Sequence, residues 1–135
     1  VRNGSVTGLG SAGISLGEQA VVEDVLVRWN GGIGILVDLG SRVSDAVVFA
    51  NGSDGVFTDA GTTVSNSVIY DNNGDGVEAG AGCTLENLTL RANNGAALRM
   101  GAQTIYRNVT MTSNNGGCVV GGVNLVGNSC NGSPN

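Results

Sequence analysis

Apolar and polar residues recur along this chain at a fixed interval. The stretch 66–77, NSVIYDNNGDGV, illustrates the interval, because Asn66 is followed by Asn87 and Asn108 at successive steps of 21. A second column runs from Asn30 to Asn114 with no insertion or deletion. A fixed period of this length predicts a solenoid, in which each repeat covers the apolar side of its neighbours.

Within each repeat, apolar and polar residues alternate as in short β-strands that are separated by Ser, Asn and Gly turns, and no segment has helical periodicity. Three columns are apolar and should fill the interior: Ile14, Ile35, Val56, Val77, Leu98 and Val119; Val22, Val43, Val64, Leu85 and Tyr106; Val6, Val27, Val48, Ile69, Leu90 and Met111. Stacked residues would lie about 4.8 Å apart, the spacing of hydrogen-bonded parallel strands. The pattern predicts one all-β domain over residues 1–135, a single-stranded parallel β-helix of about six 21-residue rungs, each with three short strands and three turns.

Asparagine and aspartate fill two polar columns at turn positions. The columns are Asn30, Asn51, Asn72, Asn93 and Asn114, and Asp24, Asp45, Asn66, Asn87 and Asn108. Asn tolerates the left-handed αL conformation, and its amide can bond the rungs above and below, so we expect structural ladders that satisfy buried turn backbone. N-x-S/T sequons occur at Asn3, Asn51, Asn87, Asn108 and Asn131, but the first four coincide with ladder columns, where a ladder is favoured over a glycan.

The rung pattern resembles a known family. The segments VSNSVIYDNNGDGV and VEDVLVRWNGGIGI are similar to the right-handed parallel β-helix repeats of the pectin-lyase-like superfamily, and the resemblance covers essentially the whole chain. It implies a right-handed solenoid. The superfamily includes pectate lyases, polygalacturonases, alginate epimerases, phage tailspikes and many secreted or cell-surface proteins, so the resemblance specifies the fold far better than the function.

Charge and composition exclude several classes of partner. The net charge is −5, with neither lysine nor histidine, which argues against binding to a nucleic-acid backbone. No apolar run approaches the roughly 20 residues of a membrane span, so membrane insertion is not expected. The 24 glycines and the scarcity of aromatic residues indicate many turns around a narrow core.

The three cysteines point to a disulfide rather than to a metal site. Cys83, Cys118 and Cys130 lack the C-x-x-C spacing of zinc sites. Cys118 falls in the column of Gly34, Gly55, Gly76 and Ala97, and Cys130 falls in that of Val25, Ala46, Leu88 and Val109. We predict that these two bridge within the last rung and that Cys83 remains a buried free thiol. A disulfide favours an oxidising compartment.

Candidate chemistry gathers on one outward column, formed by Leu36, Phe57, Glu78 and Arg99. Glu78 and Asp59 could serve as a carboxylate pair for glycoside hydrolysis, with Arg99 as the base or anion clamp of a lyase. Asp38, Asp54, Asp59 and Asp75, stacked at the two ends of the strand, could instead hold Ca²⁺, and no other cofactor is expected. The simpler interpretation is that Glu78 and Arg99 form an ordinary exposed ion pair, as do Glu86 and Arg107, and that the aspartates form turns.

A second outward column contains aromatic residues and arginines. Trp29, Phe49, Tyr70 and Arg91, together with Phe57 on the first column, are the candidate carbohydrate-binding residues, since aromatic rings can stack on sugar rings. The alternative is that these residues only pack on one another. The resemblance also implies motifs that are missing: the NTD, DD, GHG and RIK set of polygalacturonases and the DPH motif of alginate epimerases have no match.

These observations favour a non-catalytic, structural or adhesive module, extracellular or on a cell surface. The alternative is a polysaccharide-processing domain, a lyase or a glycoside hydrolase, or its carbohydrate-binding part. Val1 begins in mid-rung, and the polar tail 127–135, with Pro134, would form only a thin cap. An uncapped rung invites either a further part of a longer solenoid or another subunit, so a homo-oligomer or filament through the ends is expected.

Overall fold

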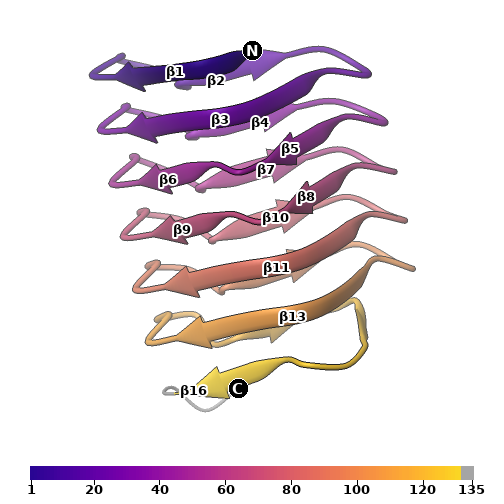
Figure 1. The fold of residues 1–135 in the computed structure, drawn as a ribbon. Coiled ribbons are helices and arrows are strands. Elements are labelled where there is room, and N and C mark those ends of the chain that lie inside the picture. Colours follow the sequence, from indigo (N-terminus) through magenta and orange to yellow (C-terminus); the bar gives the residue numbers. More distant parts are fainter. Residues whose placement is uncertain (132–135) are drawn as a thin grey trace.

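The structure, a computed structural model that describes residues 1–131, is a parallel β-helix. Successive rungs stack along one axis, with the N-terminal rung at one end and the C-terminal rung at the other (Figure 1). Among the described residues no helix is long and apolar enough to cross a membrane. The predicted fold class is confirmed.

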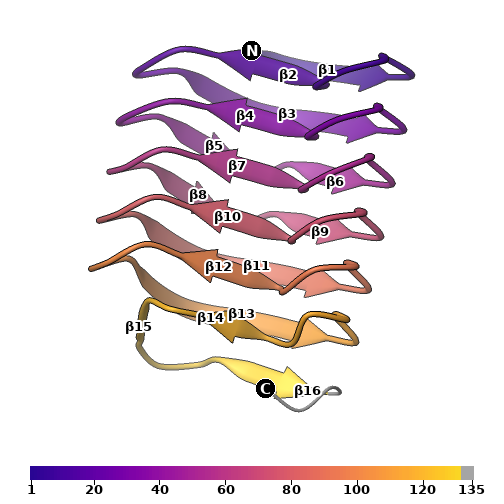
Figure 2. The same cartoon turned by 180° about the vertical axis from the view of Figure 1, so that it is seen from behind.

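Two parallel sheets form the walls of the solenoid and lie on opposite sides of it, as the two views show (Figures 1 and 2). Sheet A contains β1 (Arg2–Thr7), β3 (Val21–Arg28), β5 (Arg42–Ser44), β6 (Val47–Phe49), β8 (Thr63–Ser65), β9 (Val68–Tyr70), β11 (Thr84–Arg91), β13 (Ile105–Thr112), β15 (Val123–Asn124) and β16 (Ser129–Asn131). Sheet B contains β2 (Ile14–Leu16), β4 (Ile35–Val37), β7 (Val56–Thr58), β10 (Val77–Ala79), β12 (Leu98–Met100) and β14 (Val119–Val120).

The rungs have fewer separate strands than the sequence suggested. Two of the three predicted strands of each rung belong to sheet A, and in β3, β11 and β13 they are continuous. Elsewhere the strand divides at Asp45 or Asn66, giving β5–β6 and β8–β9. Asp45 and Asn66 have φ of 54° and 50°. Because Asp and Asn tolerate αL backbone, the chain changes direction here without leaving the sheet.

The repeat period sets the pairing of the strands. Val27 pairs with Val48, and Val48 pairs with Ile69, so equal positions of successive rungs stack directly. The three predicted apolar columns point inward. Val27, Val48 and Ile69 each have 0% exposure. Further inward columns contain Val37, Thr58 and Ala79, or Val25, Ala46 and Leu88. The core is a stack of small aliphatic layers, which needs few aromatic residues.

The predicted asparagine ladder is present and buried. Each side-chain amide from Asn30 to Asn93 donates to the Oδ1 of the asparagine one rung on, at 2.9–3.0 Å. The same Oδ1 atoms accept backbone N–H groups. The αL residue, however, is the one before each asparagine, for example Ala50 before Asn51. The expectation that the ladder residues themselves adopt αL is therefore wrong for this buried column. The second predicted column, from Asp24 to Asn108, does adopt αL, with φ of 50–54°, and it is exposed.

The last rung is shorter than the others. Ile105 pairs with Val123, and Met111 pairs with Cys130, so both partners arrive earlier in the sequence than the repeat period requires. Gly121 and Gly122, both with positive φ, make the tight turn that shortens the rung. Cys130 therefore stacks on Met111 and not in the column of Val109, because the repeat period fails in this rung.

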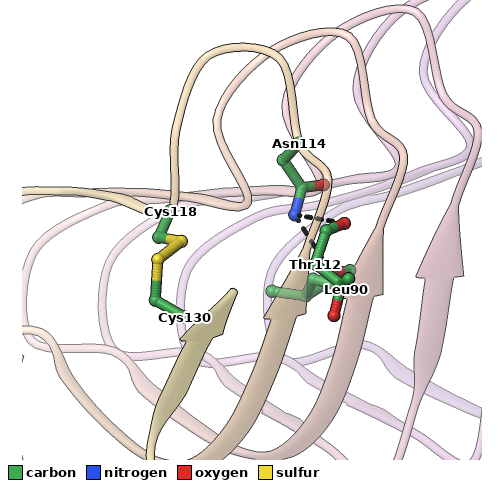
Figure 3. The surroundings of a disulfide bond; sticks show 5 residues. All are labelled: Leu90, Thr112, Asn114, Cys118 and Cys130. Atoms are coloured by element: carbon green, nitrogen blue, oxygen red, sulfur yellow. Dashed lines mark hydrogen bonds between the residues drawn. A yellow bond between two sulfur atoms is a disulfide. The ribbon is translucent and has the colours of Figure 1, made fainter. Parts of the chain in front are cut away.

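Cys118 and Cys130 form a disulfide with a Cα–Cα distance of 6.0 Å, the pair expected from the sequence. Figure 3 shows this bond beside the last asparagine of the ladder, whose amide donates to the carbonyl oxygens of Leu90 and Thr112. Cys83 is a buried free thiol. The disulfide joins Cys118, just before β14, to Cys130 in β16, and so closes the shortened last rung.

Asn128 closes the C-terminal end of the core. Its Oδ1 accepts the N–H of Val109, and its amide donates to the carbonyl oxygens of Tyr106 and Leu125 and to Asn124 Oδ1. These bonds satisfy backbone groups that a further rung would otherwise pair. The predicted cap, 127–135 with Pro134, lies partly outside the described residues.

Candidate functional site

The outer face of sheet B presents one side chain from the middle of each strand. In order along the axis these are Ser15, Leu36, Phe57, Glu78, Arg99 and Val120. Phe57 and Glu78 are half-buried, whereas Arg99 is exposed. No enclosed pocket is found among the described residues, so this face is open. An open face of this kind suits an extended polymer better than a small molecule.

Two aspartates beside this column bond to the backbone of neighbouring rungs. Asp54 Oδ1 accepts the N–H of Asp75 at 2.7 Å, and Asp75 Oδ1 accepts the N–H of Ala96 at 2.6 Å. A Cβ at Gly74 or Gly95 would collide with these carboxylates, so glycine is required at both positions. Each aspartate therefore links two rungs through a backbone hydrogen bond, which fixes the position of its carboxylate.

Arg99 joins the aspartates and not its neighbour in register. Its Nε donates to Asp75 Oδ2 at 2.5 Å, and Asp75 is buried at 5% exposure. Glu78 pairs with Arg99 in strand register, but no hydrogen bond joins the Glu78 carboxylate to another described residue. The predicted Glu78–Arg99 ion pair is thus replaced by Asp75–Arg99, while the predicted Glu86–Arg107 ion pair is present.

The three carboxylates of Asp54, Asp75 and Glu78 converge, with one oxygen from each lying within 4.8 Å of the others. We call Asp54, Asp75, Glu78 and Arg99 the acidic cluster. Burial, and then the charges of Asp54 and Asp75, raise the pKa of Glu78, while Arg99 opposes this rise. Burial also raises the pKa of Asp54, partly offset by its bond to the Asp75 N–H. Glu78 therefore combines a raised pKa with a carboxylate that bonds to no described residue, whereas backbone N–H groups hold the carboxylates of Asp54 and Asp75.

The acidic cluster fits Ca²⁺ poorly. Ca²⁺ takes about six to eight oxygen ligands. Both oxygens of Asp75 and one oxygen of Asp54 are already used by backbone N–H groups or by Arg99. Three carboxylate oxygens then remain, and the guanidinium occupies part of the space.

The other predicted ligands lie elsewhere. Asp38 and Asp59 follow β4 and β7, whereas Asp54 precedes β7, so a whole strand separates the two groups. Asp59 accepts the N–H of Ala60 in an exposed turn. The charges that act on Glu78 come from the acidic cluster and do not include Asp59. The structure therefore groups Glu78 with Asp54 and Asp75.

The sequence pointed to Glu78, Asp54, Asp75 and Arg99, but it paired Glu78 with Asp59 rather than with Asp54 and Asp75. Asp54 and Asp75 each precede an outward strand position, Phe57 and Glu78 respectively, by one short turn. The intervening glycine, Gly55 or Gly76, packs against the ladder asparagine of the next rung, Asn72 or Asn93, and leaves no room for a Cβ. The available sequence signal is a D-G-V-x pattern that occurs in two successive rungs, at 54–57 and 75–78, and this pattern is also typical of an ordinary turn.

The aromatic column on sheet A is packed on itself. Phe49 and Tyr70 stack with ring centroids 4.7 Å apart, and Trp29 meets Phe49 edge-on at 6.2 Å. The guanidinium groups of Arg28 and Arg91 lie over the rings of Trp29 and Tyr70, at 4.2 and 4.3 Å. The ring faces of Phe49 and Tyr70 are largely occupied by these neighbours, whereas Trp29 is 57% exposed.

The comparisons with known proteins support the fold. No protein-family model and no curated protein sequence matches the chain. The structure is similar to that of the periplasmic alginate epimerase AlgG, with a TM-score of 0.76 and 14% sequence identity over 94% of this chain. It is also similar to the A-module of the Azotobacter vinelandii mannuronan C-5 epimerase AlgE4, with a TM-score of 0.60 and 13% identity over 93% of this chain. The chain spans 37% of the first protein and 52% of the second. The similarity confirms the parallel β-helix as the fold.

Proposed function

We propose that this chain is a polysaccharide-binding β-helix, and that it binds through the outer face of sheet B around Glu78. One observation carries the proposal: three carboxylates and Arg99 converge on an open sheet face beside half-buried Phe57. The structural neighbours, named as alginate and mannuronan epimerases, favour a polysaccharide partner over the structural or adhesive role expected from the sequence.

The chemistry of the face suits a sugar chain. Phe57 and Leu36 offer apolar surface to the C–H groups of a sugar ring, and Glu78 can accept or donate hydrogen bonds with its hydroxyls. Arg99 keeps donors that are not used by Asp75, because only its Nε is bonded. The Asp75–Arg99 pair is fixed by the backbone, so these groups need little reordering when the polymer binds.

A processing activity, if it accompanies binding, would use Glu78 as the proton-exchanging group. Its pKa is raised, and the carboxyl oxygens of the cluster approach within 4.8 Å, close to the separation of about 5 Å that retaining glycosidases use. The chain spans less than two thirds of the similar structures, so binding is the first candidate function and catalysis is the second. A location outside the cytoplasm goes with this proposal, supported by the disulfide and by the periplasmic neighbour.

Affinity electrophoresis and calorimetry with alginate, polygalacturonate, pectin and a neutral glucan would test the proposal. Wild type should bind at least one of these polymers, and Glu78→Gln and Phe57→Ala should each weaken binding on the order of tenfold. Glu18→Gln, an exposed acid outside the cluster, is the matched control and should bind as wild type does.

The same samples report on catalysis. Unsaturated products, new reducing ends or a changed uronate stereochemistry, measured by absorbance and NMR, would identify a lyase, a hydrolase or an epimerase. Loss of product in Glu78→Gln with binding retained would assign Glu78 to chemistry. Binding that is equal in wild type, Glu78→Gln and Phe57→Ala would overturn the choice of this face.

A further inference from the structure

The outer face of sheet A carries a second surface, separate from the acidic cluster on sheet B. Its central column is Leu26, Val47, Val68, Thr89 and Thr110, stacked in strand register. Val47 is 36% exposed, and Leu26 and Val68 are half-buried. Three aliphatic side chains on adjacent strands thus face outward with no described residue covering them.

An arginine-bearing column lies two positions after the central column. It consists of Arg28, Phe49, Tyr70, Arg91 and Thr112. Arg28 and Arg91 form no ion pair with any described carboxylate, and aromatic rings hold both guanidinium groups in place. Two oriented and unneutralised cations therefore border the aliphatic patch.

An acidic and amide column lies two positions before the central column. It consists of Asp24, Asp45, Asn66, Asn87 and Asn108, all exposed. Asp24 and Asp45 form no ion pair with a described residue. Asp24 and Arg28 lie on the same strand, β3, and no ion pair joins them.

We infer that this surface binds a second copy of the chain about a two-fold axis that is parallel to the solenoid axis and passes over the central column. Such an axis keeps each rung level and exchanges the two flanking columns. Arg28 of one copy then meets Asp24 of the other, twice over. The aliphatic residues of the central column meet their own equivalents, as an isologous interface requires.

The remaining rungs are complementary under the same operation. The Tyr70 hydroxyl meets the amide of Asn66, and the Arg91 guanidinium meets the amide oxygen of Asn87. Phe49 meets Asp45, a contact in which the positive edge of the ring faces a carboxylate. A two-fold axis along the strands would instead invert the order of the rungs and bring Arg28 against Arg91. Like charges disfavour that arrangement, so the pattern selects one dimer geometry.

A sugar chain is a poorer occupant of this surface. The flat faces of Phe49 and Tyr70 are covered by each other and by Arg91, leaving mainly ring edges at the surface. The inference is independent of the proposed polysaccharide site, which lies on sheet B.

Sedimentation velocity of the full chain over a concentration series tests the dimer. Wild type should show a reversible monomer–dimer equilibrium. Arg28→Glu places two acids together and should raise the dimer dissociation constant at least about tenfold. The double variant Arg28→Glu with Asp24→Arg restores opposite charges and should recover most of the affinity. Val47→Lys should abolish the dimer, and Glu78→Gln on sheet B is the control that leaves it unchanged.

Circular dichroism and thermal melting confirm that each variant is folded, which matters for Asp24→Arg because an αL position disfavours arginine. A wild type that stays monomeric at the highest concentration overturns the inference. So does a folded double variant that remains as dissociated as Arg28→Glu. If Arg28→Glu instead lowers binding to the polysaccharide panel with no change in oligomeric state, the surface is a sugar site and the dimer is refuted.

Discussion

Asn93 and Asn94 are neighbours in sequence with opposite surroundings. Asn93 is fully buried, and its Oδ1 accepts both the backbone N–H and the amide of Asn72. Asn94 is exposed, and its side chain bonds to the surface amides of Asn73 and Asn115. Although the two residues are chemically identical, only the first satisfies groups that water cannot reach.

Asn93→Ala should therefore destabilise the domain by at least about 2 kcal/mol, because it leaves several buried donors and acceptors unpaired. Asn94→Ala should change the free energy of unfolding by less than about 0.5 kcal/mol. Urea denaturation of both variants measures the difference. Equal effects would show that the buried ladder has no special energetic role.

Ile69 tests the register of the core. It lies between Val48 and Leu90 in the stack and has 0% exposure. Ile69→Asp buries a charge without a partner and should unfold the domain, as circular dichroism would show. Asn66→Asp adds the same charge to an exposed αL position of the same rung and should remain folded. A folded Ile69→Asp variant would refute the inward assignment of this column.

At the scale of the element, the turn before β7 contains Asp54, whose effect on the free energy of unfolding depends on pH. Burial raises the pKa of Asp54 above its ordinary value of 3.8. The folded state therefore binds more protons than the unfolded state between the two pKa values, and stability falls as pH rises through that interval. The folded state tolerates this loss of stability because the Asp54 carboxylate accepts a hydrogen bond from the N–H of Asp75 in the next rung.

Asp54→Asn removes the charge and keeps an Oδ1 acceptor for the Asp75 N–H. The variant should melt at a higher temperature than wild type at neutral pH, and the difference should shrink as pH falls below about 3.8, where Asp54 is protonated in both states. Asp38→Asn, an exposed aspartate that follows the strand β4, is the control. A difference that does not depend on pH would show that charge is not the cause.

At the scale of the whole molecule, each rung pairs only with the rung before and the rung after it. Such a solenoid is held together by nearest-neighbour contacts, so its ends open before its middle. The last rung adds the Cys118–Cys130 bond, a closure that typically contributes about 3 kcal/mol for a short loop.

Hydrogen exchange should accordingly show the strongest protection in β8–β10 and the weakest in β1 and β16. Cys118→Ser with Cys130→Ser should speed exchange in the segment 119–131 and leave the central rungs unchanged. Cys83→Ser is the matched control, because its column already contains Ser41, Thr62 and Thr104. Uniform loss of protection along the whole chain in the double variant would mean that the rungs unfold as one unit.

The sequence by itself determined the repeating part of this protein. Direct stacking makes equal positions of successive repeats neighbours in space, so the repeat alone identifies Val48, Ile69 and Leu90 as core and Asn51, Asn72 and Asn93 as ladder. The pairing of Cys118 with Cys130 was likewise visible as two cysteines in one rung.

Only the tertiary structure decided what breaks the repeat or reaches across it. The shortened last rung moved Cys130 from Val109 to Met111, because a glycine turn changed the register. The acidic cluster depends on where the turn side chains of Asp54 and Asp75 point, and Arg99 bonds to Asp75 rather than to its register partner Glu78. Side-chain direction at turns is set by the three-dimensional packing of successive rungs, so a one-dimensional period could place these residues near one another without showing which of them meet.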